Sequence, residues 1–173
     1  LTAANIPEGI VSIGNSVFQN CTSLADVKLP ESLTTIGSYA FGYCSRITRV
    51  SFPEKLNSIG SYAFRNCSGL TEITFPDGLA HIGSYAFQNC TGLTVLQIPG
   101  GLSSLGNNMF SGCTNLTKIV FLYGLTGVPS YMCSGMSSLT EVVFEEGPQG
   151  EASTMQSIGA NAFYNCTGLE HIS

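Results

Sequence analysis

Apolar residues recur along the chain with a period of 23, and each period repeats one order of apolar, polar and turn residues. Residues 36–44 read IGSYAFGYC, and the same nine positions read IGSYAFRNC at 59–67 and IGSYAFQNC at 82–90. A catalytic site needs its special residues once, whereas a line repeated at a fixed interval is typical of stacked structural repeats. The chain therefore divides into rows at 1–23, 24–46, 47–69, 70–92, 93–115 and 116–138.

The end of the chain departs from this period. A seventh row spans 139–168 and carries a seven-residue insertion within EEGPQGEASTMQ, and a partial row occupies 169–173. Neither end shows a polar cap, although solenoids need capping repeats for solubility. We therefore expect a single repeat domain over 1–173 that is a fragment of a longer array, or one whose uncapped ends associate into an oligomer.

The first part of each row has the alternation of a strand. In the fourth row, LTEITF places Leu70, Ile73 and Phe75 on one side and Glu72 and Thr74 on the other. This period of two predicts a strand with one buried face.

The second part of the row predicts a turn, a short extended piece and a helical turn. Pro76-Asp77-Gly78 has turn chemistry, and Leu79 and Ile82 are then expected to point inward. Ser84 is an expected N-cap for a single helical turn over 85–89, with Ala86, Phe87 and Cys90 on its inner side.

A single row cannot bury its own apolar face, whereas stacked rows can. Neighbouring rows would lie about 4.8 Å apart along the hydrogen-bonding direction, so seven rows predict a curved slab about 35 Å long. In this arrangement Ala is small where the backbone passes closely, and Phe fills the coil.

The pattern L-x-x-I-x-[FIL]-P-x-x-L-x-x-I-G-x-x-A-F-x-x-C resembles the BspA-like, spirochaete-type class of leucine-rich repeats. The match covers nearly the whole chain. The resemblance implies an α/β repeat solenoid: a right-handed superhelix with a parallel concave β-sheet and short strands and single helical turns on its other faces. It also implies an extracellular bacterial surface protein, often an adhesin for host matrix or plasma proteins, in a family without common catalytic residues.

Composition and charge limit the classes of partner that the chain can bind. Charged residues make up 10% of the chain, Lys and Arg number six, and the net charge is −5. Nucleic-acid binding needs a basic stripe to neutralise phosphates, so this partner is excluded. No apolar run reaches the roughly 18 residues of a membrane helix, and a signal peptide and anchor are expected outside this segment.

Seven cysteines are present, and five of them form a column at intervals of 23 residues: Cys21, Cys44, Cys67, Cys90 and Cys113. A metal site or a redox relay is one interpretation. The sequence has no C-x-x-C spacing and only two histidines, which disfavours zinc. We predict small, buried, inert thiols, and no metal or cofactor. In the sixth row Cys133 replaces the usual Phe and Met136 the usual Cys, which indicates two positions in contact.

Two further columns have plain interpretations. The acidic residues after the turn proline would hold a divalent cation if they converged, but a solvated edge is the simpler prediction. These residues are Glu8, Glu31, Glu54 and Asp77. Asn-x-Ser/Thr sequons recur because the repeat does, and we interpret their Asn as turn residues. They begin at Asn20, Asn66, Asn89, Asn115 and Asn165.

The outward positions of the strands are the first candidate binding surface, because solenoids commonly bind through their concave sheet. These positions are Asp26 and Lys28, Arg49 and Ser51, Glu72 and Thr74, Val95 and Gln97, Lys118 and Val120, and Glu141 and Val143. The three valines predict an exposed apolar stripe, with Tyr123 near the same edge, that would mark a protein contact. Chance variation on a solvated sheet is the alternative.

Tyrosines on the expected helical turns are the second candidate surface: Tyr39, Tyr62, Tyr85 and Tyr131. Tyr is a favoured contact residue, although the column would equally shield the outer edge of each coil. The insertion in the seventh row is a loop, and loops carry function disproportionately.

Catalysis finds no support, since the chain lacks G-x-S-x-G, H-E-x-x-H, G-x-G-x-x-G and P-loop motifs. The sequence therefore predicts a non-catalytic protein-binding module at the cell surface or in the extracellular space. Its expected partners are extracellular proteins of a host or neighbouring cell, such as matrix components. The alternatives are a structural spacer that presents another domain, and carbohydrate binding through the tyrosine column.

Overall fold

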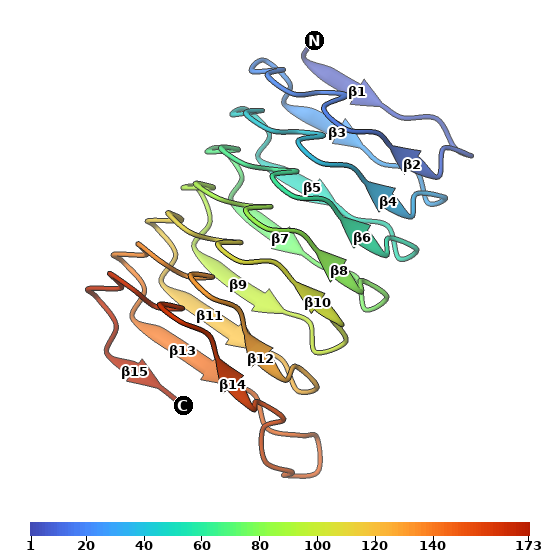
Figure 1. Ribbon diagram of the computed structural model, residues 1–173. Helices are drawn as coiled ribbons and strands as arrows, with labels where there is room; N and C mark the ends of the chain where they lie inside the picture. Colours follow the sequence, from blue (N-terminus) through green and yellow to red (C-terminus); the bar gives the residue numbers. More distant parts are fainter.

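The computed structural model describes all 173 residues as a stack of coils, with the two termini at opposite ends (Figure 1). We number the coils 1 to 7 after the seven rows of the sequence. Each coil contributes one strand to each of two parallel arrays, and the structure contains no helix. Consequently no segment forms a helix that is long and apolar enough to cross a membrane.

The odd-numbered strands come from the LTEITF part of each row. Their bounds are β1 (Ala3–Asn5), β3 (Asp26–Lys28), β5 (Arg49–Ser51), β7 (Glu72–Thr74), β9 (Val95–Ile98), β11 (Lys118–Phe121), β13 (Glu141–Phe144) and β15 (His171–Ile172). In β7 the middle residue is buried and its two neighbours are exposed, which confirms the predicted alternation. We call this array the odd-strand sheet, and it occupies the place of the predicted concave sheet.

The even-numbered strands are two residues long and follow the proline turn of each row. They are β2 (Ser12–Ile13), β4 (Thr35–Ile36), β6 (Ser58–Ile59), β8 (His81–Ile82), β10 (Ser104–Leu105), β12 (Gly127–Val128) and β14 (Ser157–Ile158). Pairing is parallel throughout, and partners such as Arg49 and Glu72 are separated by one repeat. The long loop of coil 7 lies between β13 and β14 (Figure 1).

Neither array is paired without interruption. The odd-strand sheet is divided between β3 and β5 and again between β7 and β9, while the even strands are divided between β10 and β12. The break between β10 and β12 is explained by Pro129, which follows β12. Gly83 and Gly106 donate their N–H groups to Ile59 and Ile82 of the preceding coil, and proline at the equivalent position has no N–H to donate.

The single helical turns predicted after the even strands are wrong. Residues 37–44 form two successive turns, closed by Ala40 N–H to Gly37 O and by Cys44 N–H to Phe41 O. The third residue of each turn has a positive φ, 55° at Tyr39 and 65° at Tyr43, as type II turns require. The N–H groups of these two tyrosines and of Phe41 donate to the next coil instead. We call the equivalents of 37–44 in each coil the turn segments.

The core lies between the two arrays and contains no buried polar or charged residue. Phe18, Phe41, Phe64, Phe87 and Phe110 stack with ring centroids 5.1–5.4 Å apart. In coil 6 the replacements of the sixth row, Cys133 and Met136, are both fully buried. The Phe column thus fills one coil after another, as the repeated Phe predicts.

Candidate functional site

The outward residues of the odd-strand sheet form two columns across the coils. The first column comprises Asp26, Arg49, Glu72, Val95, Lys118 and Glu141. The second column comprises Lys28, Ser51, Thr74, Gln97, Val120 and Val143. The structure therefore brings every residue of the predicted first surface onto one sheet, because each occupies an alternate position of its strand.

Charges in the first column alternate in sign along much of its length. Lys118 and Glu141 form an ion pair at 2.9 Å, and a pair this exposed stabilises a fold by less than about 1 kcal/mol. Arg49 and Glu72 are register partners as well, yet no ion pair forms between them. Asp26, Arg49 and Glu72 thus remain free charged groups on an exposed surface.

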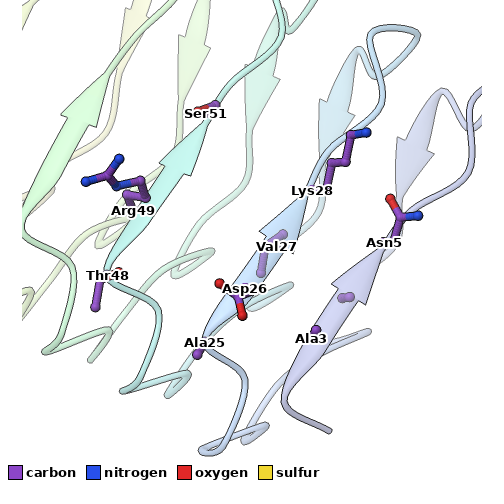
Figure 2. A pocket seen from close by; sticks show the side chains of 10 residues that line it. Ala3, Asn5, Ala25, Asp26, Val27, Lys28, Thr48, Arg49 and Ser51 are labelled. Atoms are coloured by element: carbon purple, nitrogen blue, oxygen red, sulfur yellow. The ribbon is translucent and has the colours of Figure 1, made fainter.

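A shallow depression of about 600 Å³ lies over the break between β3 and β5 (Figure 2). Figure 2 shows Asn5, Lys28 and Arg49 projecting from three neighbouring strands around it. Asp26 adds a negative charge beside these groups. The depression therefore offers both signs of charge and amide donors within the reach of one ligand segment.

The three valines do not form one stripe. Val120 and Val143 are register partners in the second column and are half-buried. Val95 belongs to the first column, where it pairs with Lys118, and its side chain is 51% exposed. The predicted apolar stripe is thus a pair of adjacent valines and one separate, more exposed valine. The difference arises because Val95 stands at the position of Glu72, not at that of Thr74.

The tyrosine column is a stack over three coils. The rings of Tyr39 and Tyr62 lie 4.6 Å apart and those of Tyr62 and Tyr85 4.9 Å apart, nearly parallel in both cases. Tyr131 is separated from this stack by coil 5, which has Asn108 at the same position, and its ring is 40% exposed. The second predicted surface is therefore a three-ring stack and a lone tyrosine.

The cysteine column is structural. Cys44, Cys67, Cys90 and Cys113 are fully buried, and each Sγ–H donates to a carbonyl of the preceding coil, as Cys90 does to Phe64 O at 3.1 Å. Burial raises the pKa of the Cys44 thiol to about 11 and that of Cys113 to about 12. Burial also raises the pKa of Cys90 well above its usual value. The neutral thiol is thereby favoured over the nucleophilic thiolate.

The acidic column and the sequon asparagines also follow from the turns. Glu8, Glu31, Glu54 and Asp77 are exposed, and Glu31 N–H donates to Glu8 Oε1 at 3.3 Å. No group of three or more His, Cys, Asp or Glu residues is placed to hold a metal ion.

The sequon residues with a positive φ, near 60°, are Asn20, Asn66, Asn89 and Asn165. Asn tolerates this region better than most residues, which confirms their interpretation as turn residues.

Sequence reasoning missed two residues of the turn segments, Arg65 and Tyr43. The Arg65 guanidinium lies over the rings of Tyr43 and Tyr62, at 5.9 Å and 5.5 Å from their centroids. Neither residue is repeated at its position in other coils. Comparison of the rows in register would have found Arg65, because it is the single charged residue in any turn segment.

A stack of parallel two-strand coils with an inward Leu, Ile and Phe pattern and an exposed, variable strand face defines a leucine-rich-repeat solenoid. The model of the BspA type leucine rich repeat region matches residues 1–57, 34–150 and 150–173, with six copies. The chain belongs to this family. No curated protein matches the sequence.

Solved structures agree with this assignment. The chain is similar to a leucine-rich repeat protein of T. pallidum, with 27% identity, a TM-score of 0.86 and coverage of 97% of this chain and 78% of that one. It is also similar to a leucine rich cell surface protein of Faecalibacterium prausnitzii A2-165, with 31% identity and a TM-score of 0.83. That match covers 98% of this chain and 46% of the other.

A leucine-rich repeat protein of Bacteroides ovatus is 30% identical, with a TM-score of 0.70 and coverage of 97% and 47%. The chain thus spans about half the length of two of these three proteins.

Proposed function

We propose that the chain is a non-catalytic protein-binding module exposed at the cell surface, and that its odd-strand sheet adheres to extracellular proteins such as host matrix components. The observation that carries the proposal is the set of free charged side chains around the depression on β1, β3 and β5. The similarity to a protein described as a leucine rich cell surface protein supports the location.

The coil architecture suits such a role. Within each paired group of odd-numbered strands, backbone hydrogen bonds between coils fix the strands, so their outward side chains are presented at set spacings and little ordering entropy is lost on binding. Charge alternation along the first column favours partners with complementary charges, because unmatched charges are costly to desolvate.

Surface plasmon resonance against immobilised fibronectin and fibrinogen tests the proposal. Wild type is compared with the double variant Lys28→Glu/Arg49→Glu and with Val95→Glu. The control variant Lys55→Glu makes the same kind of charge change at an exposed position on the acidic edge.

We expect saturable binding that the double variant weakens at least about tenfold and that the control leaves unchanged. Equal loss in the control would show a non-specific charge effect and contradict the assignment to the sheet. Absence of binding to these and other matrix proteins would favour the spacer interpretation.

A further inference from the structure

The turn segments carry no carboxylate, although the protein is acidic overall. All eleven Asp and Glu residues lie elsewhere, and the net charge is −5. The seven turn segments are 14–21, 37–44, 60–67, 83–90, 106–113, 129–136 and 159–166. Their side chains are otherwise hydroxyl, amide, aromatic or apolar, and Arg65 is the one charge among them. The turn segments as a group are therefore free of negative charge.

Arg65 is held by aromatic rings rather than by a counter-ion. Its guanidinium lies over Tyr43 and Tyr62, an arrangement that contributes about 0.5–1 kcal/mol at an exposed site. Its Nε atom is buried and has no hydrogen-bond partner, and the same is true of Oε1 of Gln88 at the same position of the next coil. No ion pair involves Arg65. The buried Nε is out of a ligand's reach, so the outer Nη groups of the guanidinium are the donors suited to a carboxylate or a sulfate.

The tyrosines beside Arg65 are not required by the backbone. Tyr39, Tyr62, Tyr85 and Tyr131 all have φ between 55° and 61°, which costs about 1–2 kcal/mol for residues other than Gly, with Asn and Asp the common exceptions. Coils 5 and 7 have asparagine at this position, Asn108 and Asn161. Ring stacking offsets the cost for three of the tyrosines, but Tyr131 stacks on no ring. The backbone conformation alone therefore does not explain tyrosine at this position.

The stack also determines how a ligand would contact it. Tyr39 and Tyr85 stack against the Tyr62 ring, and the Arg65 guanidinium lies over it as well, so ring edges and hydroxyl groups are left for contact. The rings recur from coil to coil with centroids 4.6 Å and 4.9 Å apart, so each coil adds one hydroxyl group to the column. A ligand that repeats its own hydroxyl groups can engage several coils at once, and the gain from each added contact is multiplied.

We propose that the turn segments of coils 2 to 4 bind a linear polysaccharide that carries carboxylate or sulfate groups. Arg65 binds one anionic group, and the hydroxyls of Tyr39, Tyr62 and Tyr85 bind the sugar hydroxyls. Tyr43, whose ring also lies against the guanidinium, helps to position it. This surface is separate from the odd-strand sheet and does not depend on the function proposed for that sheet.

The test uses the 173-residue chain with four probes: heparin, polygalacturonate, neutral cellohexaose and poly-glutamate. Binding is followed by tyrosine fluorescence, since the chain has seven Tyr and no Trp, and by calorimetry at two salt concentrations. The variants take residues that the fold already accepts at the same position. Arg65→Gln copies Gln88, and Tyr62→Asn copies Asn108. Lys55→Gln on the acidic edge, outside both proposed binding surfaces, is the matched charge control.

We expect heparin or polygalacturonate to bind, with affinity about tenfold lower in Arg65→Gln and in Tyr62→Asn and unchanged in Lys55→Gln. Added salt should weaken binding in wild type more than in Arg65→Gln. Three results would overturn the proposal: no binding of either acidic polysaccharide, equal loss in Lys55→Gln, or binding of cellohexaose that Arg65→Gln leaves unchanged. Equally strong binding of poly-glutamate would assign the site to acidic peptides and overturn the choice of polysaccharide.

Discussion

At the scale of single residues, the glycine that follows every even-numbered strand except β12 bears on how closely two coils approach. A Cβ built on Gly60 would lie 2.6 Å from Ser38 N and 2.7 Å from Gly37 C of the preceding coil. These are backbone atoms, which cannot move aside as a flexible side chain would. The conserved spacing of glycine in the rows therefore reflects close packing of coils and not a left-handed backbone.

Gly60→Ala should lower the free energy of unfolding by about 1–3 kcal/mol, the usual cost of forcing extra volume into a packed site. Urea denaturation followed by circular dichroism measures this. Gly101→Ala is the control, because its Cβ would meet only Asp77 O at an ordinary 3.5 Å. If both variants lost the same free energy of unfolding, close packing between coils would not explain the glycine at position 60.

The buried thiols predict a loss of stability in alkali. The thiol pKa is 9.0 when unperturbed, and burial raises it to about 12 at Cys113. The folded state therefore keeps its proton while the unfolded state loses it, so the stabilisation is complete below pH 9 and is lost as the pH rises from 9 towards 12. Each such thiol contributes a fall of about 1.4 kcal/mol per pH unit in that window.

Urea unfolding at pH 8, 9 and 10 measures this fall. Cys113→Ala should show a smaller decrease between pH 9 and pH 10 than wild type. A profile that stays flat above pH 9 in wild type would show that the thiols are not protected from solvent.

At the scale of elements, the sequence predicts the strands well and the turn segments badly. Alternation in LTEITF depends on which face is buried, and this can be seen within one row. In the turn segments, Ala86, Phe87 and Cys90 have helix-like spacing, but alternate N–H groups donate to the next coil. Bonds between coils have no signature within a single row. The break at Pro129 could be predicted, since proline lacks an N–H, whereas the breaks beside β5 and β9 have no such signal.

Some features of the candidate site can likewise be predicted from the sequence, and others cannot. The two outward columns follow from strand alternation, so their membership is predictable. Two features depend on side-chain rotamers and on neighbouring coils: the absence of an ion pair between Arg49 and Glu72, and the position of the Arg65 guanidinium over two tyrosine rings. The sequence of one row does not contain that information.

The tyrosines with a positive φ allow a prediction about the stability of variants at this position of the turn segments. Tyr131→Asn should raise the free energy of unfolding by about 0.5–1 kcal/mol, because asparagine tolerates a positive φ and no ring stacking is lost. Tyr62→Asn gains the same relief but loses two stacked pairs, each of which stabilises by about 0.5–1.5 kcal/mol. Urea denaturation of the two variants should therefore place Tyr131→Asn above Tyr62→Asn. The reverse order would contradict the stacking argument.

At the scale of the whole molecule, the breaks in the two arrays never coincide. The odd-strand sheet is unpaired between coils 2 and 3 and between coils 4 and 5, where the even strands are paired. The even strands are unpaired between coils 5 and 6, where β9 pairs with β11. Each interface between coils therefore retains at least one strand pairing, and the Phe column crosses coils 1 to 5.

Unfolding in urea should accordingly be a single cooperative transition. Stability in a solenoid is the sum of repeat and interface contributions, and no interface of this protein lacks strand pairing altogether. Circular dichroism and tyrosine fluorescence should give the same midpoint, because the tyrosines of coils 2 to 4 and the strands of all coils unfold together. Two separated transitions would show that one interface is much weaker than the others.

We expect the same staggered breaks to act as one-sided hinges, because each lacks strand pairing on one side only. Where the odd-strand sheet is unpaired, two coils can splay on that side while the even strands hold them together, and between coils 5 and 6 the hinge opens on the opposite side. Bending is then the easiest deformation of the molecule, and stretching along the stack is resisted at every interface. A sheet built in this way can change its curvature to fit a rigid partner without exposing its aromatic core to water.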